Sequence, residues 1–329
     1  MSGTLPFENL NRSVIVKREA ETSPKFGSDP LDRPIETHLE LGVVNTDKPK
    51  GPTSHQVSSY VQGILSIKKS GHSGTLDPGV TGVLPIAISK ATKVVQALLT
   101  AGKEYVGIMH MHKDVEEARL RQVCSSFVGE IRQLPPIRSA VKRQERTRRI
   151  YYFEILEIDG RDVLFRTGTE AGTYIRKLVH DMGRKLGTGA HMVELRRTKA
   201  GPFGESTLVT LQNLSDAFWL WKNKKDESLL RKAVQPMENA VDHLPKIWVL
   251  DTTVDSLCHG AQLKVPGIAK LHADIEKGKT VAIMTLKNEL VALANALMDS
   301  REIKKKSRGS ATKTERVFME IGVYPRMDK

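Results

Sequence analysis

An α+β protein is the fold class that the sequence predicts, on three observations. Segments with apolar residues at helical spacing are interleaved with segments in which apolar and polar residues alternate. Two pairs of β-rich runs are separated by short turn sequences, which is typical of antiparallel hairpins. Beyond about residue 246 the elements become short, so we expect a small β-rich module after a larger domain.

The charge of the chain indicates a polyanionic partner. Its 329 residues carry a formal net charge of +13, which makes nucleic acid the first candidate and an anionic membrane surface the second. The longest apolar runs, such as VLPIAI, fall well short of the roughly 18 residues that a membrane span requires. The first residues contain no signal-peptide core, so we expect no membrane role and a cytoplasmic protein. Cys124 and Cys258 lie far apart in sequence and are expected to be small buried residues.

The first elements follow a polar segment. Residues 1 to about 36 show no period and predict an irregular arm. LGVVNTDKP then predicts a short strand that enters a Pro/Gly loop. Residues 53–67 predict a helix with Thr53 or Ser54 as its N-cap. The apolar residues of this helix recur on one face: Val57, Tyr60, Val61, Ile64 and Leu65.

The middle of the chain predicts a strand, a hairpin and a helix. Residues 103–112 alternate as a strand does, and residues 151–170 form two β-rich runs around a turn at Asp159-Gly160. After this hairpin the apolar residues recur at helical spacing, and the predicted helix ends near two glycines, Gly187 and Gly189. The apolar face of that helix consists of Ile175, Leu178, Val179, Met182 and Leu186.

The C-terminal module, which we begin near residue 247, predicts a second hairpin around Lys287-Asn288. The basic segment 301–316 has few apolar residues and predicts a loop or a connection between strands.

A glycine-dense loop, GHSGTLDPGVTGVLP at residues 71–85, contains a single aspartate, Asp77. Glycines leave little side-chain bulk between the backbone and an approaching ligand. Pro78 disfavours the helical region for Asp77, so the carboxylate lies on an extended turn. The loop alone favours an ordinary Asp-Pro turn.

Arg176 lies in the first turn of the second helix, where the helix dipole disfavours a cation by about 0.3–1 kcal/mol. This placement suggests a neighbouring anion. The anion could be a structural carboxylate, a nucleic-acid phosphate, or a catalytic carboxylate that must remain ionised. A solvated arginine is the alternative.

The stretch RSAVKRQERTRR, residues 138–149, has a high density of positive charge against one glutamate and favours phosphate contact. A second basic group, Arg196, Arg197 and Lys199, follows the Arg176 helix. His110, His112 and Asp114 would project from one end of a strand, but no further ligand cluster accompanies them, so we expect no metal site. The sequence contains no Walker-type loop, dinucleotide fingerprint or nucleophile elbow.

Several long motifs in order resemble the TruB–dyskerin family of pseudouridine synthases. Between residues 38 and 215 they are KPKGPTSH, GHSGTLDPGVTGVLPIAISKATKV, GKEYVGIMHMH, RSAVKR, GTYIRKLVHDMGRKLG and HMVELRRTKAGPF. HGAQLKVPGIAKLHADIEKGKTVAIMTLKNELVALA resembles the PUA RNA-binding domain. With the arm and the basic stretch, the chain resembles most the archaeal dyskerin homologues, the catalytic subunits of box H/ACA particles.

The resemblance implies a mixed, largely antiparallel sheet flanked by helices, the pseudouridine synthase fold, followed by a small β-barrel-like PUA domain. It also implies three parts: an N-terminal extension packed on the PUA domain at 1–36, a catalytic domain at 37–246 and the PUA domain at 247–329.

The resemblance also assigns roles to single residues. Asp77 falls on the catalytic aspartate, Arg176 on its ion-pair partner and Tyr105 on the tyrosine that stacks on the target base. Tyr174 and Leu195 match the pocket lining, and His72 matches a histidine that helps to hold the flipped-out nucleotide. Residues 134–150 resemble a thumb loop that closes over RNA. The implied RNA-binding residues are Lys142, Arg143, Arg146, Arg148, Arg149, Arg196, Arg197 and Gly260.

The implied reaction isomerises uridine and needs neither cofactor nor metal, but every proposed route needs an ionised carboxylate. The sequence departs from the family at Lys113, where a glycine is expected.

The implied partners are a box H/ACA guide RNA, substrate rRNA or tRNA, Nop-type and Gar-type small proteins, and a kink-turn-binding ribosomal-type protein. A stand-alone tRNA pseudouridine synthase is the first alternative. A non-catalytic RNA-binding scaffold is the second, and Asp77, Tyr105 and Arg176 together argue against it.

Overall fold

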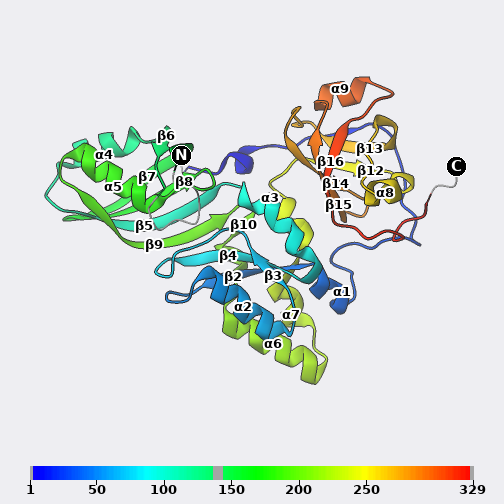
Figure 1. Cartoon of the computed structure of the whole chain (residues 1–329), viewed down its shortest axis with the longest axis horizontal. Coiled ribbons are helices and arrows are strands. Elements are labelled where there is room, and N and C mark those ends of the chain that lie inside the picture. The colour runs from blue at the N-terminus through cyan, green and yellow to red at the C-terminus, as the bar shows by residue number, and fades with distance from the viewer. Residues whose placement is uncertain (1–2, 136–143, 327–329) are drawn as a thin grey trace.

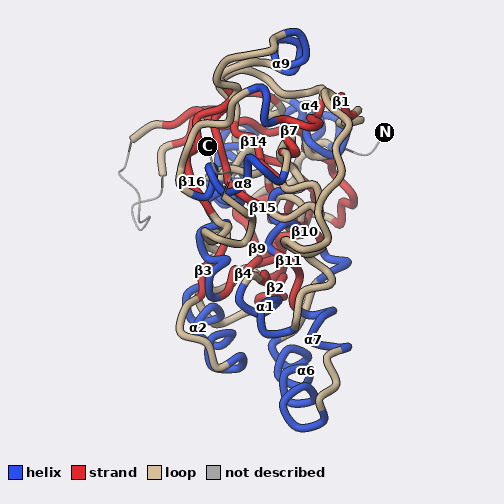
Figure 2. Tube along the Cα trace, turned by 90° about the vertical axis from the view of Figure 1, so that its right-hand side faces the viewer, coloured by secondary structure: helices blue, strands red, loops and turns tan. Residues whose placement is uncertain are grey.

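The computed structural model describes residues 3–135 and 144–326, which form two β-sheets with helices around them. In Figure 1 the larger sheet and its helices occupy the left and the bottom, and the smaller sheet lies at the right. Figure 2, turned by 90°, shows α6 and α7 at one end of the molecule and α9 at the other.

The larger sheet has the strand order β11-β2-β4-β9-β5-β8-β7-β6, with β3 paired to β4 and β10 to β9. Each of these pairs is antiparallel except β4 with β9, so the predicted mixed, largely antiparallel sheet is confirmed. The strands are β2 (Gly42–Lys48), β3 (Ser70–His72), β4 (Thr81–Ile88), β5 (Lys103–Met111), β6 (Gly129–Gln133), β7 (Arg146–Asp159), β8 (Asp162–Thr169), β9 (Ala190–Ala200), β10 (Phe203–Gly204) and β11 (Val234–Pro236).

Helices cover this sheet in two groups. Apolar residues of α2, α6 and α7 pack on β2 and β4, and those of α4 and α5 pack on β5 and β8. Both groups bury one apolar face of each helix, as amphipathic helices do. The helices are α1 (Ile35–Glu40), α2 (Ser54–Leu65), α3 (Val95–Leu99), α4 (Glu117–Ser125), α5 (Ile175–Leu186), α6 (Leu211–Lys224) and α7 (Ser228–Ala233).

The predicted elements of this region are confirmed with two corrections. Thr53 caps α2, because its hydroxyl accepts a hydrogen bond from the Gln56 amide at 3.1 Å. Tyr60 lies outside the buried face of α2 and is 48% exposed. The β7–β8 turn consists of Gly160 and Arg161, one residue later than predicted, with Gly160 at a positive φ of 56°.

The smaller sheet has the order β1-β13-β12-β14-β15-β16. The hairpin predicted around Lys287-Asn288 is confirmed as β14 and β15. The basic segment, expected as a loop or a connection between strands, does contain part of the connection between β15 and β16, but it also forms α9 and most of β16. α9 has a capping box, and β16 pairs with β15. The elements are β1 (Val14–Val16), β12 (Lys246–Val249), β13 (Ile268–His272), β14 (Thr280–Met284), β15 (Leu290–Ala296), β16 (Thr312–Val317), α8 (Asp251–Cys258) and α9 (Ser300–Lys305).

The N-terminal arm, residues 3–33, is ordered along both sheets, so the expectation of an irregular segment is wrong in part. Leu5 is fully buried beside the larger sheet, and Glu8 accepts a hydrogen bond from Lys199 at 2.7 Å. Farther along, β1 pairs with β13 of the smaller sheet. Between these contacts, Arg12 donates to the carboxylate of Asp274 and to the carbonyls of residues 242, 243 and 244 at 2.6–3.1 Å.

The two sheets share a buried apolar cluster. It joins Val43, Val83 and Ala87 of the larger sheet to Trp248 and Met284 of the smaller sheet, among others. A buried ion pair lies at the same junction. Arg33 of the arm donates two hydrogen bonds to Glu238, at 2.8 and 3.0 Å, and Glu238 also accepts from the Leu290 amide at 3.0 Å. Arm, larger sheet and smaller sheet therefore meet in one core.

Cys124 and Cys258 are free and buried, as predicted, and burial raises the pKa of the Cys124 thiol to about 12. Within the described ranges, no helix combines the length and the hydropathy that a bilayer crossing requires.

Two histidines near the junction must stay neutral in the folded protein. Burial lowers the pKa of His243, which donates to the Ala97 carbonyl, to about 4. Burial also lowers the pKa of His272, whose Nδ1 accepts from the Lys246 amide, to about 4. The unfolded chain binds these protons below its own histidine pKa of about 6.5, whereas the folded protein does not. Folding stability is therefore expected to fall as the pH drops from about 6.5 to about 4.

The urea midpoint of unfolding between about pH 7 and about pH 4.5 measures this dependence. His243→Gln should show a weaker dependence, because the variant has no proton to bind at that position. His180→Gln is the matched control, since the His180 side chain is 58% exposed. An equal pH dependence in wild type and His243→Gln would contradict the prediction.

Candidate active site

Asp77 lies on the loop between β3 and β4, flanked by two buried residues, Leu76 and Val80. The Ser54 hydroxyl at the start of α2 holds the loop, accepting from the Leu76 amide at 2.8 Å and contacting the Leu76 carbonyl at 3.1 Å. The Val80 amide donates to the Asp77 carbonyl at 3.0 Å. These hydrogen bonds fix the backbone of the loop, while the Asp77 side chain stays 56% exposed.

Arg176 forms the ion pair that its position in the first turn of α5 suggested. Its Nη2 donates to a carboxylate oxygen of Asp77, and the arginine side chain is 61% exposed. The carboxylate offsets the unfavourable dipole at the start of α5. In return, the guanidinium fixes the orientation of the Asp77 carboxylate.

The structure brings Tyr105 and Leu195 to neighbouring strands and packs both in the core that also holds Leu76 and Val80. Gly107 pairs with Leu195, and a Cβ on this glycine would lie 2.8 Å from Leu195 Cδ1. The absence of a side chain at Gly107 therefore makes room for Leu195. Tyr105 itself is half-buried, which leaves part of its ring accessible.

Tyr174 precedes α5, and its backbone is tied to β6. Its amide donates to Gln133 at 3.0 Å, and its carbonyl accepts from the same side chain at 3.2 Å. Sequence analysis missed Gln133. A buried glutamine at the end of a strand is the signal that could have indicated such a backbone contact.

His72 ends β3 with its ring at 5.8 Å, edge-on, from His55. Burial lowers the pKa of His72, and the nearby charges of His55 and Arg197 lower it further. Among the described residues, the buried Nδ1 atom of His72 has no hydrogen-bond partner. A neutral ring with an unused buried nitrogen is suited to contact with a polar group of a bound nucleotide.

Lys48 is a second residue that sequence analysis missed. It is fully buried at the end of β2, and its Nζ donates to the carbonyls of Pro49, Pro78 and Val80 at 2.9, 3.2 and 2.8 Å. Burial lowers the pKa of Lys48, and the charge of Asp77 opposes that shift. A lysine within an otherwise buried strand was the available signal.

The RNA-binding prediction for Arg197 is wrong, because its guanidinium is buried. Arg197 is 1% exposed and donates to the Val83 carbonyl at 2.7 Å and the Gly74 carbonyl at 3.4 Å. A phosphate contact requires a guanidinium that the nucleic acid can reach. Arg196, its neighbour, is 37% exposed and is paired with Asp47 and Glu205, so its RNA role stays a prediction.

The other predicted RNA-binding residues are in part described. Lys142 and Arg143 lie outside the described residues. Arg146 and Arg148 are half-buried on β7, whereas Arg149 of the same strand is exposed. Gly260 is exposed just beyond α8, with a positive φ of 84°. Their contact with RNA stays a prediction.

The histidines at the far end of β5 have other partners. His110 contacts Asp162 at 2.8 Å, and His112 contacts His191 at 3.0 Å. Within residues 3–135 and 144–326, no group of three or more histidine, cysteine or acidic side chains is arranged to hold a metal ion.

Comparisons with known proteins cover nearly the whole chain. The family models match as the DKCLD (NUC011) domain at residues 4–58, the TruB family pseudouridylate synthase N-terminal domain at 62–175, the tRNA pseudouridylate synthase B C-terminal domain at 176–242 and the PUA domain at 245–318. The probable tRNA pseudouridine synthase B of Pyrococcus abyssi is 59% identical over 321 residues, 97% of this chain and 96% of that protein. The protein of the same name from Nanoarchaeum equitans is 56% identical over 323 residues, 98% and 92% of the two chains.

Two solved structures agree closely with this fold. A chain in the crystal structure of a Cbf5-Nop10-Gar1 complex is 58% identical, with a TM-score of 0.94 over 98% of this chain and 99% of that chain. A chain in the structure of an H/ACA RNP bound to a substrate RNA containing 2′-deoxyuridine is 55% identical, with a TM-score of 0.91 over 98% and 99%. Fold, site and sequence together define an RNA pseudouridine synthase. The chain belongs to the TruB family of pseudouridine synthases, in its dyskerin group.

Lys48→Met should loosen the Asp77 loop, because three carbonyls lose their buried donor at a cost of about 1–3 kcal/mol per unsatisfied group. We expect faster amide hydrogen exchange in residues 73–80 and unchanged exchange in residues 108–111. Lys113→Met removes an exposed lysine near the far end of β5 and is the matched control. Unchanged exchange of residues 73–80 in Lys48→Met would show that the buried amine does not hold the loop.

Proposed function

We propose that this chain is the catalytic subunit of an RNA-guided enzyme that converts specific uridines of rRNA, and uridines of tRNA, to pseudouridine. The ion pair of Asp77 and Arg176 carries the proposal. The arginine holds an exposed carboxylate on a loop whose residues Leu76 and Val80 pack in one core with the half-buried Tyr105 and the apolar Leu195, on a fold that belongs to RNA pseudouridine synthases.

The chemistry assigned to Asp77 is an isomerisation. The bond between C1′ of the ribose and N1 of uracil breaks, the base rotates, and C1′ bonds to C5. C5 then releases its proton, and N1 takes up a proton from solvent. Asp77 acts as the essential carboxylate. It attacks the sugar, attacks the uracil, or removes a proton from the sugar as a general base. Arg176 orients it, Tyr105 supports the flipped-out base, and Tyr174, Leu195 and His72 complete the pocket.

The assembly is proposed from the solved relatives. One of them is a complex of Cbf5 with Nop10 and Gar1, and another is an H/ACA particle with substrate RNA. We infer the same kinds of partner here: a box H/ACA guide RNA, the small Nop-type and Gar-type proteins, and a kink-turn-binding ribosomal-type protein. The ACA end of the guide lies on the PUA domain near Gly260. The proposed parts are an extension at 1–36 that packs on the PUA domain, a catalytic domain at 37–246 and the PUA domain at 247–329. We propose that the protein acts in the cytoplasm.

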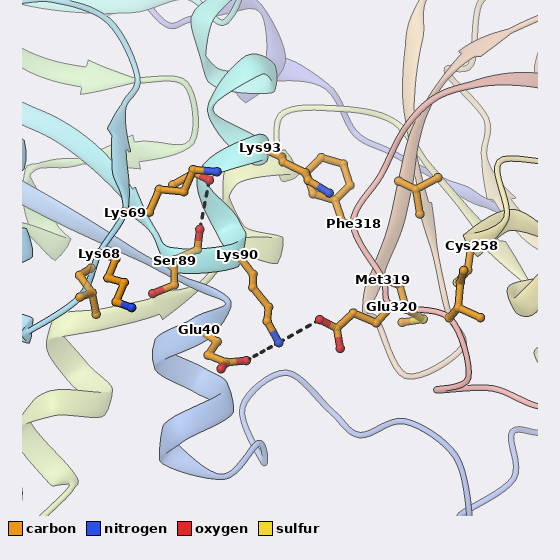
Figure 3. A pocket seen from close by; sticks show the side chains of 14 residues that line it. Glu40, Lys68, Lys69, Ser89, Lys90, Lys93, Cys258, Phe318, Met319 and Glu320 are labelled. Atoms are coloured by element: carbon orange, nitrogen blue, oxygen red, sulfur yellow. Dashed lines mark hydrogen bonds and ion pairs between the residues drawn. The ribbon is translucent and has the colours of Figure 1, made fainter.

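A basic pocket between the two sheets supports a path for the guide RNA (Figure 3). It has a volume of about 750 Å³ and is lined on one side by Glu40, residues 67–69 and the segment after β4, and on the other by residues 317–321. Lys90 bridges Glu40 and Glu320 at 2.7 and 2.9 Å across the pocket. Lys68, Lys69 and Lys93 are exposed along its lining, a density of positive charge that attracts phosphates.

Guide-free action on tRNA is the second candidate function. The relatives named probable tRNA pseudouridine synthase B favour it. The arm and the match to the DKCLD domain favour guided action as the main role. A non-catalytic scaffold, by contrast, gives no reason for an exposed carboxylate held by both an arginine and a fixed loop.

Asp77→Asn should abolish turnover without loss of RNA binding. Release of tritium from C5-labelled uridine in guide-matched RNA, with the accessory proteins present, should fall by at least about 10²-fold. Asp114→Asn is the matched control, because Asp114 is an exposed aspartate paired with an arginine, Arg161, at 2.7 Å. Binding by the wild type without release, on guided RNA and on tRNA alike, would leave only the scaffold.

Lys68→Ala combined with Lys93→Ala should weaken guide-RNA binding. The slope of log K against log salt should become less negative by about 1 for each phosphate that the variant no longer binds. Lys224→Ala with Lys225→Ala, two exposed lysines at the end of α6, should leave the slope unchanged. Equal slopes for both double variants would remove the basic pocket from the RNA path.

A further inference from the structure

Arg197 lies at the centre of the site, on a strand between the two strands that carry its parts. On β9 it pairs with Gly82 of β4 on one side and with Tyr105 of β5 on the other. The strands approach closely here, because a Cβ at Gly82 would lie 2.2 Å from the Arg197 carbonyl. The position has little freedom to shift relative to either neighbour.

The side chain of Arg197 reaches three separate parts of the site. Nε donates to the Val83 carbonyl at 2.7 Å, in β4 just after the Asp77 loop. Nη2 donates to the Gly74 carbonyl at 3.4 Å, three residues before Asp77. Tyr105 is the direct cross-strand partner of Arg197, so the two side chains stand on the same face of the sheet. Burial lowers the pKa of Arg197, and the Tyr105 side chain opposes that shift. Both ends of the loop and the tyrosine therefore meet at one guanidinium.

The burial of this cation shows how strongly the site depends on it. Arg197 is 1% exposed, and the hydrogen bonds described for its guanidinium go to carbonyls rather than to a carboxylate. A buried charge without an ion-pair partner is costly unless its donors are satisfied. The planar fork of a guanidinium can reach acceptors in several fixed directions, which the single amine of lysine cannot reproduce.

We propose that Arg197 is a positioning residue that fixes Tyr105 relative to the Asp77 loop, and so sets the distance between the base platform and the carboxylate. This inference rests on the proposed function of Asp77 and Tyr105. Arg197 does not contact the substrate in this account, because its side chain is buried and donates to the backbone of the loop. It acts through the Tyr105 hydroxyl and the Gly74 carbonyl.

The test uses single-turnover rates on prebound, guide-matched RNA in the assembled particle. Arg197→Lys should lower the rate about 10- to 100-fold, because a small misplacement of reacting groups is costly. The affinity for RNA should stay at the wild-type value. Arg166→Lys is the matched control, since Arg166 lies on β8, the strand on the other side of β5, and pairs with Glu154 at 2.7 Å. It should leave the rate unchanged.

A double-mutant cycle with Tyr105→Phe separates positioning from simple stability. Tyr105→Phe keeps the ring but loses the hydroxyl, so it should itself lower the rate. Arg197→Lys should then cost at least about threefold less in the Tyr105→Phe background than in the wild type. A merely structural arginine would lower the urea midpoint and leave these rates intact.

Three results would overturn the inference: a wild-type rate for folded Arg197→Lys, additive effects in the cycle, or a wild-type rate for Tyr105→Phe. The last applies even if Arg197→Lys fails to fold. Absence of tritium release from the wild-type particle would instead overturn the proposed function, so the two failures are distinguishable.

Discussion

The ion pair between Asp77 and Arg176 sets the constraint on which the rest of the site depends. Its two side chains are more than half exposed, since an RNA nucleotide has to reach them. Exposed ion pairs alone hold side chains weakly. The rigidity must therefore come from the backbone beneath, and it does so through Ser54, Lys48 and Arg197, which are all buried.

Among the described residues, several cations are buried, and the net charge does not distinguish them from the exposed ones. Lys48, Lys103 and Arg197 are buried and donate to backbone carbonyls. Lys103 donates to the carbonyls of Leu98, Leu99 and Ala101, and burial lowers its pKa to about 7. Such groups donate hydrogen bonds to carbonyls in turns and loops that have no backbone N–H as a partner. The exposed lysines and arginines are the ones available to RNA.

Sequence patterns predicted the larger elements because the apolar residues of each one repeat at the spacing of a helix or a strand over its whole length. The apolar face of α5 and the alternation along β5 both appear directly in the sequence. The roles of Arg196 and Arg197 could not be separated, because the stretch was interpreted as one basic group. Adjacent residues of a strand point to opposite faces, so one arginine enters the core and the other meets Asp47. The ordered structure of the arm could not be predicted either, because it comes from partners far along the chain and not from a local pattern of apolar residues.

The pairing of β1 with β13 has a consequence for the order in which the protein can be made. Arg12 and its partner Asp274 are 262 residues apart, so the arm is synthesised long before the residues that hold it. Domains usually fold as they emerge, N-terminal first. Here the arm cannot pair until β13 has been translated, so the ordering of this segment lags well behind its synthesis.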